Sequence, residues 1–188
     1  MANESKSLYA LLGVLSLGPH SGYEIKKLIE HSLAHFWQEG YGQIYPNLKR
    51  LVDQELATVE LERQEGKPDK KVYTITTSGE TRLQEWLQAP IAQLPKEKHE
   101  ILLKLFFGRN VDIKDNIAHI KLYQQRMEEL FNIYRNVEKM LRTNDHHNQD
   151  AIYQLITVRN GIYHAQAALD WCDETIDVLT KEQENQKA

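Results

Sequence analysis

Apolar or small side chains recur at alternating steps of four and three residues between positions 151 and 179. This spacing keeps them on one face of a helix, as in a coiled coil, so it predicts one long helix with a continuous packing seam. The spacing alone fits either a hairpin within one chain or the pairing of two chains. The seam consists of Ala151, Leu155, Val158, Ile162, Ala165, Leu169, Cys172, Ile176 and Leu179.

The preceding segments of the C-terminal half also have helical spacing. Residues 112–142 are predicted to form a second long helix, whose apolar positions are interrupted by Gln124 and Glu138. A shorter helix is expected after Leu94-Pro95, and the polar segment 143–149 is predicted to be a turn. Residues 91–188 are therefore expected to form an entirely helical domain.

The N-terminal half has a different and ordered set of signals. Helices are predicted at 7–17, from Ser21, at about 43–54 and from Thr77. Ser21 with Glu24, and Thr77 with Glu80, have the spacing of capping boxes. Alternating patterns at 57–63 and 71–76 predict two strands around a glycine- and proline-containing loop. This order predicts a winged helix-turn-helix domain over residues 1–90, in a chain that is mainly α with a small β-hairpin.

The third helix has the composition of a DNA recognition helix. Its inward stripe is predicted to be Ile44, Leu48, Leu51 and Val52, and amide and cationic residues lie elsewhere on it. Gln and Asn can bind adenine edges, Arg can bind guanine, and Lys can bind phosphate. An ordinary solvated helix face is the alternative. The DNA-binding candidates from the residues alone are Gln43, Pro46, Asn47, Lys49 and Arg50 of the helix, with Arg63, Lys67, Lys70 and Lys71 of the wing.

The charge balance counts against a nucleic-acid partner. The net charge is -4, and residues 1–88 contain 10 Lys and Arg against 12 Asp and Glu. DNA binding therefore needs local segregation of charge. A helical protein-interaction module that uses its winged helix without DNA is the alternative function.

Three segments resemble the PadR family of bacterial regulators: 8–15 with 21–25, 43–51, and 71–76 continuing into Ser78-Gly79. The likeness is weaker in the C-terminal half, where Arg159, Gly161 and Trp171 carry it. The resemblance implies a homodimeric repressor of an inverted-repeat operator, and it adds Tyr45 to the residues expected at or near DNA. Some members of the family release DNA when a small aromatic compound binds.

Dimerisation is also expected because one recognition helix gives little specificity, whereas a two-fold dimer presents two helices about 34 Å apart. We assign the subunit interface to the long seam. The dimerisation candidates are Leu155, Val158, Ile162, Ala165, Leu169, Cys172, Ile176 and Leu179.

A pocket for an aromatic acid is a further hypothesis, because a carboxylate needs an arginine and a ring needs aromatic walls. Dimer packing is the alternative role for the same residues. The candidates are Tyr123, Arg126, Arg159, Tyr163, His164 and Trp171. No catalytic motif, cofactor or metal site is expected, since His146-His147 has no thiol nearby and Cys172 is the single cysteine. Without a membrane span, a cytoplasmic protein is expected.

Overall fold

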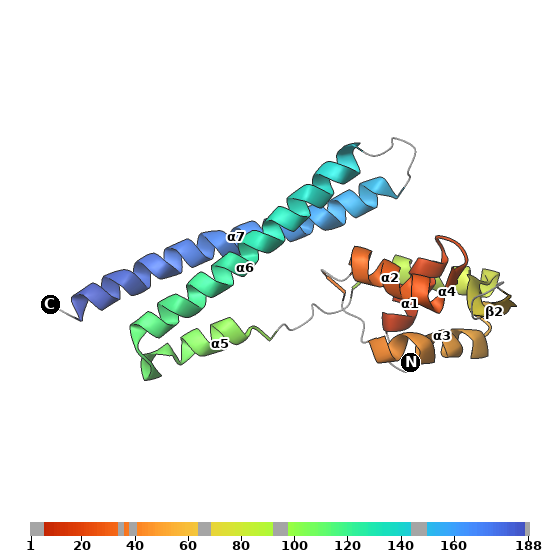
Figure 1. The fold of residues 1–188 in the computed structure, drawn as a ribbon, viewed down its shortest axis with the longest axis horizontal. Coiled ribbons are helices and arrows are strands. Elements are labelled where there is room, and N and C mark those ends of the chain that lie inside the picture. The colour runs from red at the N-terminus through yellow and green to blue at the C-terminus, as the bar shows by residue number, and fades with distance from the viewer. Residues whose placement is uncertain are drawn as a thin grey trace. The chain divides into compact units, whose positions relative to one another are not determined.

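The computed structural model describes residues 6–33, 36–37, 41–63, 69–91, 98–143 and 150–186 (Figure 1). The chain divides into two compact units, Met1–Leu94 and Pro95–Ala188, and each is described by itself. None of the helices in the described ranges is both long and apolar enough to cross a bilayer.

The first unit is a winged helix with a three-stranded antiparallel sheet of order β1-β3-β2. Strand β1 has only two residues, too few for an alternating pattern, so the sequence did not predict it. The elements are α1 (Lys6–Leu15), β1 (His20–Ser21), α2 (Gly22–Leu28), the π-helical turn η1 (Ile29–Leu33), α3 (Tyr41–Asp53), β2 (Ala57–Glu62), β3 (Lys70–Ile75) and α4 (Thr77–Gln88).

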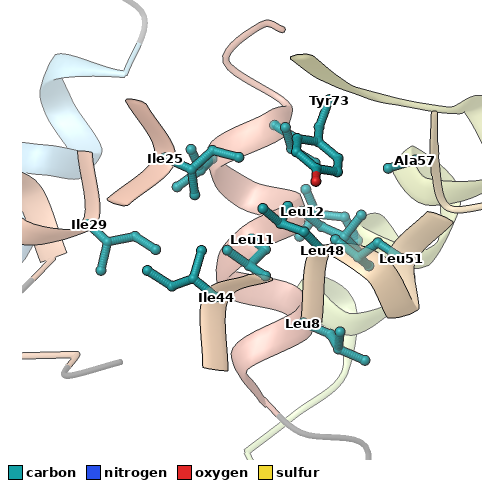
Figure 2. Close-up of a cluster of buried hydrophobic side chains, with 13 residues drawn as sticks. Leu8, Leu11, Leu12, Ile25, Ile29, Ile44, Leu48, Leu51, Ala57 and Tyr73 are labelled. Carbon is teal, nitrogen blue, oxygen red and sulfur yellow. The ribbon is translucent and has the colours of Figure 1, made fainter. Parts of the chain in front are cut away.

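The core of this unit lies between α1 and α3. Figure 2 shows Leu11 and Leu12 of α1 beside Leu48 of α3. The predicted inward stripe of α3 is confirmed for Ile44, Leu48 and Leu51, which are at most 1% exposed. Because one face of α3 is fully covered, its opposite face is fixed in position at the surface.

The two predicted helix caps differ in outcome. The Ser21–Glu24 capping box is confirmed, because the Ser21 amide donates to Glu24 Oε2 at 2.7 Å and the Glu24 amide donates to Ser21 Oγ at 3.3 Å. The Thr77 cap was wrong by one residue. Thr76 is the extended cap residue, and its Oγ1 accepts from the Gly79 amide at 3.1 Å. Thr76 Oγ1 also donates to the Glu55 carbonyl, which attaches the start of α4 to the turn that follows α3.

The second unit is built on a helical hairpin. Helices α6 (Ile113–Thr143) and α7 (Ala151–Asn185) pack side by side, and α5 (Glu100–Phe106) and the 3₁₀ turn η2 (Gly108–Asn110) precede them (Figure 1). The predicted turn lies almost wholly at 144–149, outside the described residues, as do 92–97 around Pro95.

The long seam of α7 packs on α6 within the chain, and its assignment to the subunit interface stays a prediction. Ala165 and Cys172 are buried, and among the residues that the structure describes in this unit the other long helix is α6. Across the same contact, Gln124 Nε2 donates to Asp173 Oδ1 at 2.6 Å. The seam residues of that prediction are all buried or half-buried in the single chain: Leu155, Val158, Ile162, Ala165, Leu169, Cys172, Ile176 and Leu179. The same apolar spacing fits packing on a helix of the same chain or on a helix of a second chain. In this structure the helix packed on it is α6.

Glu138, a polar break in the predicted pattern of α6, is the centre of an ion-pair cluster. It is 7% exposed, and its carboxylate lies 2.8 Å from Arg135 and 2.9 Å from Arg142 of the same helix. Arg159 of α7 approaches it to 4.0 Å. Hydrogen bonding to Arg142, followed by the charges of the three arginines, lowers the pKa of Glu138.

We expect Glu138→Gln to destabilise the protein at neutral pH and to do so less in acid. The pKa of Glu138 is lower in the folded state than its ordinary value of 4.5, so the ionised carboxylate stabilises the fold at pH values above 4.5. This contribution is lost as the pH falls through the lowered pKa. Thermal unfolding followed by circular dichroism between pH 7 and pH 3 measures the difference in Tm. Glu128→Gln, at an exposed position of α6, is the control. A Tm difference that does not change with pH would contradict this role.

Candidate nucleic-acid interface

The outer face of α3 is the first part of the candidate site. It consists of the exposed residues Gln43, Tyr45, Pro46, Lys49 and Arg50. These residues lie opposite the buried stripe, so their side chains are presented to solvent by a helix that is anchored along its length. The face combines an amide, two cations and an aromatic hydroxyl.

Pro46 lies deeper in α3 than the sequence indicated. The helix begins at Tyr41, so Pro46 follows the first turn rather than lying in it. Proline has no N–H, so the carbonyl of Gly42 cannot receive the usual bond from position 46. Gly42 is exposed, and water can satisfy its carbonyl.

Asn47 is a correction to the candidate list. It is 5% exposed, although the sequence placed it away from the buried stripe. The reason is its spacing, since position 47 follows Ile44 by three residues and precedes Leu51 by four, and so shares their face. Asn47 therefore does not belong to the outer face of α3.

The wing is the second part of the candidate site. Strands β2 and β3 pair antiparallel from Ala57↔Ile75 to Glu62↔Lys70. The wing loop at 64–68, which includes Lys67, lies outside the described residues. Beside it, Arg63 and Lys71 are exposed.

Lys70 has a structural role that the sequence did not indicate. Its Nζ lies 3.3 Å from Glu62 and 3.8 Å from Glu24, so it joins the two wing strands to α2. The pKa of Glu24 is lowered mainly by the hydrogen bond from the Ser21 amide, and Lys70 adds to this. With its charge shared between two carboxylates, Lys70 is less suited to bind phosphate, and we remove it from the candidate interface.

Tyr45 lies where three elements of the first unit meet. Its ring is 57% exposed but has one edge against Gly22, the first residue of α2. Tyr73 of β3 is buried nearby, and its pKa is raised by burial and, to a lesser extent, by Tyr45. No local pattern connects residues 22 and 45, so the sequence does not predict the contact of Tyr45 with Gly22.

The six ligand candidates do not form one site. Tyr123 and Trp171 do meet, with ring centroids 6.1 Å apart and the rings nearly perpendicular. Arg159 instead donates to the hydroxyl of Tyr163 at 2.8 Å. That pair lies about 12 to 18 Å along α7 from Trp171, at 1.5 Å per residue. Arg126 and His164 are exposed.

An apolar pocket adjoins the Tyr123–Trp171 pair. Its volume is about 250 Å³, and it is lined by His99, Ile101, Leu102, Tyr123, Ala168 and Trp171. No charged lysine or arginine lines it, in contrast to the predicted pocket. Within the described ranges, no three His, Cys, Asp or Glu side chains come together as metal ligands.

Comparisons with known proteins give a family match for each half of the chain. Residues 11–85 match the model of the transcriptional regulator PadR-like family, and residues 97–180 match that of the virulence activator alpha C-terminal region. The negative transcriptional regulator PadR of Bacillus subtilis is 35% identical over 136 residues, covering 71% of this chain and 74% of that protein.

Solved structures show the same fold. The structure of Bacillus subtilis PadR in complex with operator DNA has a TM-score of 0.84 and 23% identity, over 93% of this chain and 99% of the other. The complex of Bacillus subtilis PadR with p-coumaric acid has a TM-score of 0.76 and 24% identity, over 92% and 97%. The similarity thus extends over the winged helix and the helical region together.

Proposed function

The chain belongs to the PadR-like family of transcriptional regulators, and from this premise we propose that it is a repressor that binds an inverted-repeat DNA operator as a homodimer. The observation that carries the proposal is the outer face of α3, where an amide and two cations are held at the surface by a fully buried opposite stripe. The 35% identical relative is named a negative regulator, which favours repression over activation.

The proposed DNA contacts follow from the chemistry of the exposed residues. Arg50 suits the O6 and N7 atoms of guanine, Gln43 suits adenine, and Lys49 suits phosphate. The wing cations would bind the backbone beside the groove. The proposed set is Gln43, Tyr45, Pro46, Lys49, Arg50, Arg63, Lys67 and Lys71. Five of these eight residues are cations, in a chain whose net charge is -4.

The homodimer is supported by the need for two recognition helices and by uncovered apolar surface on the second unit. The seam of α7 already packs on α6, so the more exposed apolar side chains of the unit are further candidates for the pairing of chains. Apolar side chains that are at least 48% exposed on α5 and α7 are Leu102, Leu103, Phe106, Ile152, Tyr153, Ile156, Tyr163 and Val178.

A small aromatic effector is proposed for the apolar pocket at Tyr123 and Trp171. The perpendicular rings and the apolar lining suit an aromatic ring. The Bacillus subtilis protein, which shares the fold, has been solved with p-coumaric acid. An arginine for the acid group would have to come from beyond the lining residues.

A mobility-shift assay with DNA from upstream of the protein's own coding region tests the proposal. We expect a complex of two chains per inverted repeat that survives competition by a scrambled duplex and weakens steeply with salt. Addition of hydroxycinnamates to the same complex tests the effector, with release as the expected result. No complex at low salt would reject DNA binding and favour a protein-interaction role for the winged helix.

A further inference from the structure

Gly22 has a backbone position that is fixed by its neighbours. It directly follows β1, in which Ser21 pairs with Val72 of β3. Ser21 also forms the capping box with Glu24, so the chain is held on both sides of Gly22. Gly22 itself is buried. A substitution there cannot be accommodated easily by movement of the backbone.

The space beside Gly22 is occupied by the ring of Tyr45. A Cβ built at position 22 would lie 2.5 Å from Cε1 and 3.1 Å from Cζ of Tyr45, which is closer than van der Waals contact allows. The three nearest atoms all belong to this one ring. Tyr45 is on the outer face of α3 and is 57% exposed, so its ring has free space into which it can rotate.

The backbone of Gly22 does not itself require glycine. Gly22 lies at the first position of α2 and has no left-handed φ, so alanine fits its conformation. Alanine is also the better helix former. The atoms nearest to a side chain at position 22 are therefore those of the Tyr45 ring, and we expect this exposed ring to turn away without unfolding the protein.

We propose that Gly22 is a positioning residue for DNA binding, because its lack of a side chain sets the orientation of the Tyr45 ring on the outer face of α3. The inference deepens the proposed function and rests on it. Its consequence is that a residue of α2 with no side chain of its own influences how the recognition helix contacts an operator.

A double-mutant cycle tests this inference with Gly22→Ala, Tyr45→Ala and the double variant. We expect Gly22→Ala to weaken operator binding by roughly 2- to 150-fold, the range of coupling between contacting residues. In the Tyr45→Ala background the same substitution should have no effect. The Tm of the Gly22→Ala single variant should equal or exceed that of the unchanged protein. Gly13→Ala in α1, where a Cβ would have open space, is the matched control.

A second measurement tests the ring orientation without DNA. The ring proton shifts of Tyr45 in NMR spectra should change in Gly22→Ala and stay constant in Gly13→Ala. Unchanged affinity of Gly22→Ala for an operator that the unchanged protein binds would overturn the inference and leave the proposed function intact. An equal loss of affinity with and without Tyr45 would also overturn it. If the unchanged protein binds no operator, the proposed function and the inference fall together.

Discussion

Leu48→Ala is expected to lower the free energy of unfolding of the N-terminal unit by about 2–5 kcal/mol. Leu48 is fully buried on the inward face of α3, beside Leu11 and Leu12 of α1 (Figure 2). Truncation loses the transfer free energy of the removed carbons and leaves a cavity that neighbouring helices fill only in part. Urea unfolding followed by circular dichroism measures the change from the transition midpoint.

Leu87→Ala on α4 is the matched control for this prediction, because Leu87 is 65% exposed. The same chemical change at an exposed position should alter stability by no more than about 0.5 kcal/mol. Equal effects at the two positions would mean that the buried stripe does not anchor α3. The proposed presentation of its outer face would then lose its physical basis.

Arg50→Ala is expected to weaken operator binding by about 1–3 kcal/mol, or roughly 5- to 150-fold, if Arg50 contacts guanine in the major groove. The loss should depend on sequence, with relaxed discrimination at one base pair of each half-site. Lys49→Ala should act differently. Loss of a phosphate contact weakens binding to all sequences, and it reduces the slope of log K against log salt concentration by about one. Titration of wild-type and single-base-variant operators at several salt concentrations separates the two roles.

Arg82→Ala on α4 controls for the general loss of a positive charge from the same unit. It should leave the salt dependence and the preference for operator unchanged. If Arg82→Ala weakened binding as much as Arg50→Ala, the effect would reflect overall charge rather than contacts of the outer face of α3.

The sequence predicted most of the architecture because its strongest signals are local. The Ile44, Leu48 and Leu51 stripe follows from helical spacing, and the Ser21–Glu24 cap follows from a three-residue motif. Asn47 was misplaced because its polarity was weighed more heavily than its spacing. The sequence does not distinguish which of the adjacent threonines, Thr76 or Thr77, caps α4. In the structure the cap is Thr76, whose backbone is extended.

Features that depend on distant parts of the chain could not be predicted in the same way. Lys70 reaches Glu24 across 46 positions, and Tyr45 meets Gly22 across 23, so neither contact has a periodic signature. The seam of α7 was recognised correctly as a packing face, but spacing does not identify the partner helix. In the described residues that partner is α6.

Because the α7 seam packs on α6 of the same chain, folding of this hairpin does not require a second chain. Each chain can complete its α6–α7 hairpin before it encounters a second copy, because Ala165 and Cys172 are already covered within one chain. In the proposed homodimer, subunits would then be able to exchange without unfolding of this hairpin. Occupancy of the proposed operator would then depend on the concentration of folded chains.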